Sequence, residues 1–326
     1  MINRTGPAAS PACFQLLYTD VTLHIRDMRY YMAFIFPIIG LVSFVIVVLG
    51  SYKRASKSTG HFYMIVLGVA DLYAIVSMQT QWLMNKFGYS FNRIECVLRQ
   101  FHAVCPTQVA IWILVLMTVD RAVAVSQPLK AASLCTIKRA KVSISGAVCL
   151  LAAYNFAWSI FFKPHKHDIR TTCQIDEINI AFIYEIVVNV LSLYGPIPVI
   201  AVTNAVIISS VRKSANMQQQ QQISQTAKKQ DASRKITVLV VTTALVFLVS
   251  TFPAGLFELL FLEYGTAQKT GLYYWTHCDT AYGAFLLFGY EFGQMIYDVN
   301  HVINGFVYVA SSQQFQKDLR AAITRS

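Results

Sequence analysis

Long apolar stretches alternate with short polar segments along almost the whole chain. Because about 20 apolar residues in a helix cross the hydrocarbon core of a bilayer, each stretch predicts one membrane-spanning helix. The seventh stretch contains several polar residues, so periodic burial rather than bare hydropathy must account for it. The pattern predicts an all-α membrane protein, a bundle of seven transmembrane helices at residues 30–50, 62–84, 97–119, 142–162, 180–208, 236–262 and 281–309.

Composition agrees with this pattern, and the loop charges indicate an orientation. Hydrophobic residues make up 55% of the chain and charged residues 13%, whereas soluble proteins carry about 25% charged residues. Positively charged loops stay in the cytoplasm, so the N-terminus is expected outside the plasma membrane and the C-terminus inside. The basic residues are scattered over four loops, which argues against nucleic acid as a partner and favours anionic lipid. Those four segments, 51–61, 121–141 (counted with Asp120), 209–235 and 310–326, carry +2 to +5, and the alternate segments −1 to +1.

These boundaries divide the chain into three parts. We expect an extracellular N-terminus at 1–29, a transmembrane domain at 30–309, and a short cytoplasmic end at 310–326. Within the domain, the run Gln218–Gln222 lies in a basic segment at about 212–235, and such low complexity predicts a disordered loop. Asn3 begins an Asn-Arg-Thr sequon on the expected outer side, so it is a candidate for glycosylation.

A charged pair, Asp120 and Arg121, stands at the inner end of the third span. Ionisable residues within spans are costly and often functional; the alternative is a pair that snorkels at the interface.

Cys96 lies 25 residues before Arg121, roughly 37 Å along a helix, which puts it at the oxidising outer face. Cys173 lies in an outer loop within its reach. Candidates for a second outer disulfide are Cys13 and Cys278.

Five features at the matching ends of the spans resemble the rhodopsin-like (class A) G-protein-coupled receptors, over about residues 30–323. "DRAVAVSQPLK" resembles the DRY motif of that family, "LGVADL" its second-helix motif, and "NGFVY" its NPxxY motif. "SSQQFQKDL" resembles its short amphipathic helix eight, and two cysteines match its outer disulfide. The residues that carry these matches are Asp120, Arg121, Asp71, Asn304, Tyr308, Cys96, Cys173 and Phe315, the last as a membrane anchor.

The resemblance also implies a conformational switch. In the family, Asp120 would hold Arg121 at rest, and outward movement of the sixth helix would free Arg121 for a heterotrimeric G protein. Prolines bend helices because they remove backbone hydrogen bonds, and a ligand shifts the population by binding one packing better. The positions that match the repacking residues and the helix bends are Pro196, Ile111, Phe247 and Pro253.

Several positions depart from the family pattern and point to a subgroup. Gly305 replaces the proline of NPxxY, Thr251 stands at the usual tryptophan of the sixth helix, and the first span has no asparagine. The stretch "GYEFGQMIYDVNHVINGFVYVASSQQF" resembles the seventh helix of invertebrate FMRFamide and myosuppressin receptors. We therefore expect a receptor for an extracellular amidated neuropeptide; the alternatives are a divergent orphan or chemosensory seven-helix receptor, or a seven-span transporter.

The ligand contacts are expected in the outer half of the bundle. Opsins need a seventh-helix lysine for retinal, whereas no lysine lies between Lys269 and Lys317, and Asp298 takes roughly that position. Amine receptors need a carboxylate where this chain has Ala103. Acidic residues of the outer halves could accept a cationic ligand group or pair internally, for example with Arg99; aromatic residues could form a floor or simply pack. These candidates are Asp298, Glu258, Glu291, Glu185, Trp82, Tyr297, Phe257 and Phe261.

The polar residues at mid-span suggest one cofactor at most. Asp71, Asn300 and Asn304 could hold a sodium ion, as in the family, although Ala110 replaces the usual serine; the alternative is a water-bridged polar cluster. No catalytic constellation is visible, so we expect no enzyme activity. His165 and His167 near Cys173 are too weak a pattern to predict a metal site.

Overall fold

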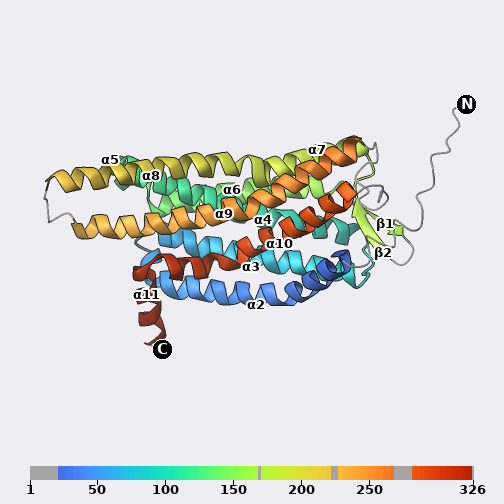
Figure 1. Cartoon of the computed structure of the whole chain (residues 1–326), viewed down its shortest axis with the longest axis horizontal. Helices are drawn as coiled ribbons and strands as arrows, with labels where there is room; N and C mark the ends of the chain where they lie inside the picture. Colours follow the sequence, from blue (N-terminus) through green and yellow to red (C-terminus); the bar gives the residue numbers. More distant parts are fainter. Residues whose placement is uncertain (1–20, 168–169, 222–226, 268–280, 325–326) are drawn as a thin grey trace, which may run out of the picture.

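The structure is a computed structural model that describes residues 21–167, 170–221, 227–267 and 281–324. Long helices lie side by side along one axis, and a small hairpin and a short terminal helix lie at opposite ends (Figure 1). The long helices are α2 (Val21–Ala55), α3 (Thr59–Lys86), α4 (Arg93–Ser126), α6 (Ile137–Ser159), a fifth made of α7 (Ile178–Asn189), η1 (Val190–Tyr194) and α8 (Pro196–Gln221), α9 (Ala227–Ala267) and α10 (Ala281–Ser311); the short elements are α5 (Pro128–Leu134), β1 (Lys163–His167), β2 (Arg170–Gln174) and α11 (Gln313–Ile323).

The predicted seven-helix bundle is confirmed. Within the described residues, 6 helices are long and apolar enough to cross a membrane, and they coincide with the first six predicted stretches. The seventh, α10, packs against α9, α2 and α3. Its polar residues therefore face protein rather than lipid, which is how a helix of modest hydropathy is accommodated in a bundle.

Two regions expected outside helices are helical. α2 begins at Val21, nine residues before the predicted span, so it includes the last nine residues of the segment that the sequence assigned to the N-terminus. The segment 212–235 was expected as a loop, but α8 continues to Gln221 and α9 begins at Ala227. Gln, Lys, Ala and Met are good helix formers, and both helices extend past their neighbours here (Figure 1).

The fifth helix contains one π-helical turn, η1, immediately before Pro196. Gly195 N donates to Val190 O at 2.8 Å, a bond that spans five residues. Such a turn leaves carbonyl groups for other partners, and Trp112 Nε1 of α4 donates to Leu191 O at 3.0 Å. Gln108 of α4 also donates to the Ser192 hydroxyl at 3.2 Å. The fifth helix is thus fastened to α4 at its irregular turn.

Gly305 marks a close approach between α10 and α2. Its backbone N–H donates to Ser43 Oγ at 2.8 Å, and a Cβ at position 305 would collide with the backbone oxygen of Ser43. A proline has no N–H and carries a ring at this place. The contact therefore explains why glycine stands where the family motif has proline. Ser43 makes this contact from α2, the first span, in which the sequence analysis found no asparagine.

The amphipathic helix eight is confirmed as α11, but the role expected for Phe315 is wrong. The Ser312 hydroxyl accepts a hydrogen bond from Phe315 N at 3.2 Å and so caps the helix. The Phe315 side chain is 1% exposed and lies edge-on to Tyr308, with ring centroids 5.8 Å apart. It also fills the space beside Gly50 of α2. Phe315 therefore anchors α11 to the bundle rather than to the membrane.

We expect Phe315→Ala to destabilise the bundle, because truncating a buried Phe typically costs about 3–5 kcal/mol. The melting temperature of the purified protein should fall clearly. Ile323→Ala, in the same helix but 57% exposed, is the matched control and should melt like the wild type. Equal melting of both variants would place Phe315 outside the packed core.

Candidate functional site

The C-terminal end of α4 holds Arg121 in a closed set of hydrogen bonds. Arg121 is 6% exposed; its guanidinium pairs with Asp120, with Nε at 3.1 Å from Oδ2. Thr59 at the start of α3 donates its hydroxyl to Asp120 Oδ2 at 2.8 Å, and Arg121 Nη2 donates to Thr59 Oγ1. Asp120 therefore holds Arg121 as the resemblance implied, and Thr59 is a third member that sequence reasoning missed.

The residues predicted to switch lie in the centre of the bundle. Ile111 of α4 and Phe247 of α9 are 2% and 0% exposed and belong to one buried cluster. Pro196 begins α8 directly after the π turn, and Pro253 lies inside α9. Thr251 is fully buried, and its hydroxyl has no partner among the described residues. The arrangement fits the predicted roles; movement of these residues on activation stays a prediction.

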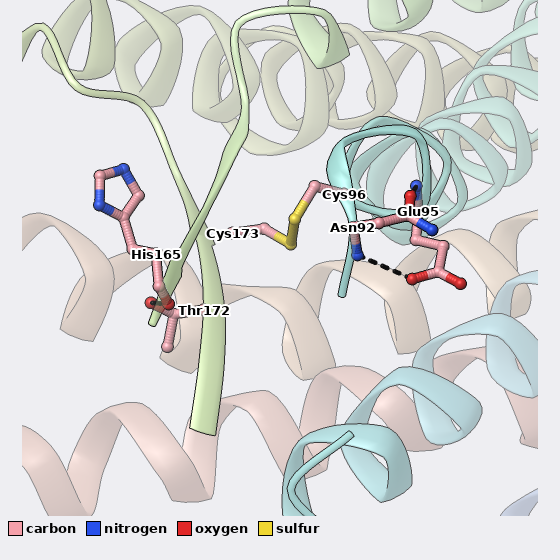
Figure 2. Close-up of a disulfide and its surroundings, with 6 residues drawn as sticks. All are labelled: Asn92, Glu95, Cys96, His165, Thr172 and Cys173. Atoms are coloured by element: carbon pink, nitrogen blue, oxygen red, sulfur yellow. Dashed lines mark hydrogen bonds between the residues drawn. A yellow bond between two sulfur atoms is a disulfide. The ribbon is translucent and has the colours of Figure 1, made fainter. Parts of the chain in front are cut away.

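The opposite end of α4 is tied to the hairpin by the Cys96–Cys173 disulfide, which joins α4 to β2 with Cα atoms 5.5 Å apart (Figure 2). α4 begins there with a reciprocal cap, in which Asn92 N donates to Glu95 Oε2 at 2.8 Å and Glu95 N to Asn92 Oδ1 at 3.0 Å. The predicted disulfide is thus confirmed. It also removes Cys173 from any metal site, and the described residues contain no cluster that could hold a metal ion.

The hairpin carries a small exposed charge network. Asp176 accepts from Lys163 Nζ at 2.5 Å and lies 2.7 Å from His165 Nε2. These contacts, first with Lys163 and then with His165, hold the pKa of Asp176 below its usual value. Exposed pairs of this kind contribute little free energy, so the network adds little to the stability of the hairpin.

The four predicted acidic residues form two groups rather than one. Glu185 of α7 and Glu258 of α9 are close enough to repel each other, and Glu258 accepts from Asn189 Nδ2 at 3.5 Å. Glu291 and Asp298 both lie on α10, seven residues apart, or two helical turns. The sequence reasoning treated all four alike, whereas the fold separates them by the helices that they face.

The α10 group contains a cation that the sequence analysis missed. Arg29 of α2 forms an ion pair with Glu291 and also attracts the charge of Asp298. Asp298 is 3% exposed; its Oδ2 accepts from Gln79 Nε2 at 3.0 Å, and its Oδ1 has no partner among the described residues. Arg29 was missed because its segment was assigned to the N-terminus.

The internal partner proposed from sequence for the carboxylates, Arg99, lies elsewhere. Its guanidinium carbon lies 4.9 Å from the centre of the Phe91 ring, and none of the ion pairs among the described residues involves it. Aromatic residues act mainly as packing: Tyr297 is 7% exposed and lies edge-on to His301. Trp82 lies beside Tyr30, with Lys86 5.8 Å above the centre of its ring.

The mid-span polar residues meet at Asp71. His301 Nδ1 lies 2.8 Å from Asp71 Oδ1, and Asn304 Nδ2 donates to Asp71 Oδ2 at 2.6 Å. Asn300 is buried on the same helix, 5% exposed. His301 was missed in the sequence analysis, although a histidine inside a span is itself a signal of a polar site.

Some predicted sites fall on parts of the chain that the structure leaves undescribed. These are Asn3, Cys13 and Cys278, which lie outside the described residues, and the side chain of Phe261. The glycosylation and the second disulfide therefore stay predictions.

Comparison with known proteins defines the class. The sequence profile of the "7 transmembrane receptor (rhodopsin family)" matches residues 43–308. The chain is 23% identical to green-sensitive opsin-1 of Danio rerio over 282 residues, 82% of this chain and 77% of the opsin. It is 25% identical to the blue-sensitive opsin of Anolis carolinensis over 273 residues, 77% and 71% of the two chains. It is also 23% identical to rhodopsin of Galeus melastomus over 269 residues, 78% and 72%.

Because the profile covers most of the chain, the protein belongs to the rhodopsin family of seven-transmembrane receptors. It is therefore a multi-pass membrane protein and a G-protein-coupled receptor, not an enzyme. This class accounts for Arg121 at the C-terminal end of α4 and for the disulfide at its other end.

We expect Thr59→Val to raise ligand-independent G-protein activation. The change keeps the shape of the side chain but removes the hydroxyl that bonds both Asp120 and Arg121. Hydrogen bonds to charged groups contribute about 1.5–3 kcal/mol, and 1.4 kcal/mol corresponds to tenfold, so a rise of about tenfold is expected in a nucleotide-exchange assay.

Two variants control this experiment. Thr203→Val removes a hydroxyl that donates only within its own helix, to Val199 O at 2.8 Å and Ile200 O at 3.0 Å, and should leave basal activity unchanged. Arg121→Ala should abolish activation at normal surface expression. Wild-type basal activity in Thr59→Val would show that Thr59 does not restrain Arg121.

Proposed function

We propose that this receptor binds an extracellular ligand with a cationic group, an amidated neuropeptide, and responds by activating a heterotrimeric G protein. The observation that carries the proposal is the state of Asp298: a buried carboxylate with one oxygen left without a partner among the described residues. A buried charge is costly unless it is paired. A ligand cation would supply the missing partner, most effectively an arginine, whose guanidinium can bond a carboxylate through two N–H groups.

The charges around Asp298 favour a ligand that carries a single positive group. Arg29 is bonded to Glu291 and also attracts Asp298, so the two carboxylates share this one cation, and Gln79, which donates to Asp298, is neutral. One cation against two carboxylates leaves one negative charge in this region of α2, α3 and α10. A monocationic side chain would neutralise it, whereas an anionic ligand would be repelled.

The position of Asp298 also argues against a bound retinal. It lies six residues before Asn304, where the resemblance places the lysine that opsins use, and the sequence has no lysine from 270 to 316. The relatives named above are opsins, but identities of 23–25% support a shared fold and family rather than a shared ligand. The seventh-helix likeness to FMRFamide and myosuppressin receptors favours a peptide.

The proposed orientation places the hairpin end outside the cell. The disulfide needs an oxidising compartment, and it lies at the hairpin end, opposite α11 (Figure 1). Basic loops cluster toward the α11 end, as the positive-inside rule requires for a cytoplasmic face. A peptide would then enter between the hairpin and the outer ends of the helices.

We expect Asp298→Asn to lower the binding affinity for an amidated peptide that ends in Arg-Phe by a hundredfold or more. Breaking a buried charge pair costs about 3–5 kcal/mol, and each 1.4 kcal/mol is tenfold. The same peptide with citrulline in place of arginine should bind the wild type and the variant about equally. Radioligand competition on membranes measures both; undiminished binding of the arginine peptide to the variant would refute Asp298 as the acceptor.

The opsin alternative has a direct test. We expect that incubating the protein with 11-cis-retinal yields no visible absorbance band, because the seventh helix offers no lysine for a Schiff base. The substitutions Asp298→Ala, Asp298→Ser and Asp298→Thr should give the same result. Asp298→Lys is the informative variant, because it supplies a lysine at roughly the position that opsins use for the Schiff base. A wild-type pigment would overturn the peptide proposal and identify a chromophore receptor.

A further inference from the structure

Asp71 is fully engaged by side chains of α10. It is 3% exposed in the middle of α3, and each of its carboxylate oxygens has a partner: His301 Nδ1 at 2.8 Å from Oδ1 and Asn304 Nδ2 at 2.6 Å from Oδ2. The two partners are three residues apart and so share one face of α10. When Asp71 is ionised, both partners act as N–H donors to it.

The family resemblance implies a sodium ion at this carboxylate, and the residues present do not fit one. Hard cations are held by several oxygen atoms at once. Here both oxygens of Asp71 are bonded to nitrogen atoms, and Asn304 turns its NH₂ group, not its oxygen, toward Asp71. Ala110 of α4 is 1% exposed and has no side-chain oxygen where the family has serine. The two groups that contact Asp71 are thus both nitrogens, and the oxygen of this set left without a partner among the described residues, Asn304 Oδ1, belongs to the amide whose NH₂ group bonds Asp71.

His301 is also held in place by its surroundings. Its side chain is 0% exposed, and its ring lies edge-on to Tyr297, with centroids 5.4 Å apart. A buried carboxylate needs compensation by charge or hydrogen bonds, and a large, fixed imidazole supplies that compensation from within the chain. Its Nδ1 also occupies the position next to Asp71 Oδ1 that an ion would take.

We propose that His301 takes the place of the ion in this receptor, so that Asp71 joins α3 to α10 directly and the site is closed to sodium. The link between the two helices is then a permanent part of the fold. Sodium concentration sets neither the stability of the bundle nor the balance between its resting and active packings, whatever the ligand proves to be.

The test is thermal melting of the purified full chain in mixtures of NaCl and choline chloride at constant total salt. A ligand that binds only the folded state raises the melting temperature in a concentration-dependent way. The melting temperature of the wild type should not depend on the fraction of sodium. A saturable rise that is specific to sodium and lost in Asp71→Asn would overturn the proposal, whereas a rise that survives Asp71→Asn comes from another site and agrees with it.

A second variant tests the role of His301 directly. The double substitution Ala110→Ser with His301→Ser replaces the imidazole by hydroxyl oxygens and restores the missing oxygen of α4. It should gain a melting temperature that rises with sodium and a basal nucleotide-exchange rate that falls with sodium. If the double variant folds and remains indifferent to sodium while the single variant Ala110→Ser responds, then His301 does not close the site.

Discussion

The polar residues of α10 impose the constraint on which the rest of the bundle depends. This helix carries two carboxylates, two asparagines and a histidine, and none of them could face hydrocarbon without a large cost. Each therefore has to meet protein, and the neighbouring helices supply what is needed: Arg29 from α2, Gln79 and Asp71 from α3. The packing of α10 between α2, α3 and α9 follows from this need. Among the described residues, hydropathy alone identifies six helices as membrane-spanning. The position of the seventh, α10, depends on the hydrogen bonds and the ion pair of its polar residues.

These contacts also line up the functional regions along one helix. From its N-terminal toward its C-terminal end, α10 presents Asp298 for the proposed ligand, His301 and Asn304 for Asp71, and Tyr308 against Phe315. Tyr297 touches His301 from one turn above. A ligand that favours one position of the N-terminal half of α10 therefore acts on the same helix that holds the polar centre and α11. Population shift needs only such a difference in affinity between two packings.

Sequence reasoning predicted the membrane spans, the outer disulfide and helix eight, because apolar length and motif position determine them. It could not tell which apolar side chain faces protein, so Phe315 was assigned to the lipid when it fills a space beside Gly50. It missed Arg29 because nothing in a local pattern shows that a helix starts before its apolar stretch. It missed Thr59 and Gln79 because single polar residues become partners only when two helices meet. The separation of the four acidic residues into two groups is likewise a property of packing.

Gly305 has a consequence for protein engineering. Stabilising substitutions are often chosen by restoring the residue that a family most commonly uses, and here that rule would put proline at 305. The backbone N–H of Gly305 is already bonded to Ser43, and the space beside it is occupied by the backbone of α2. A consensus design for this receptor would have to exempt this position, or change residues 43 and 305 together. A family consensus reflects the contacts that are most common between helices, and the contact between Ser43 and Gly305 differs from the common one.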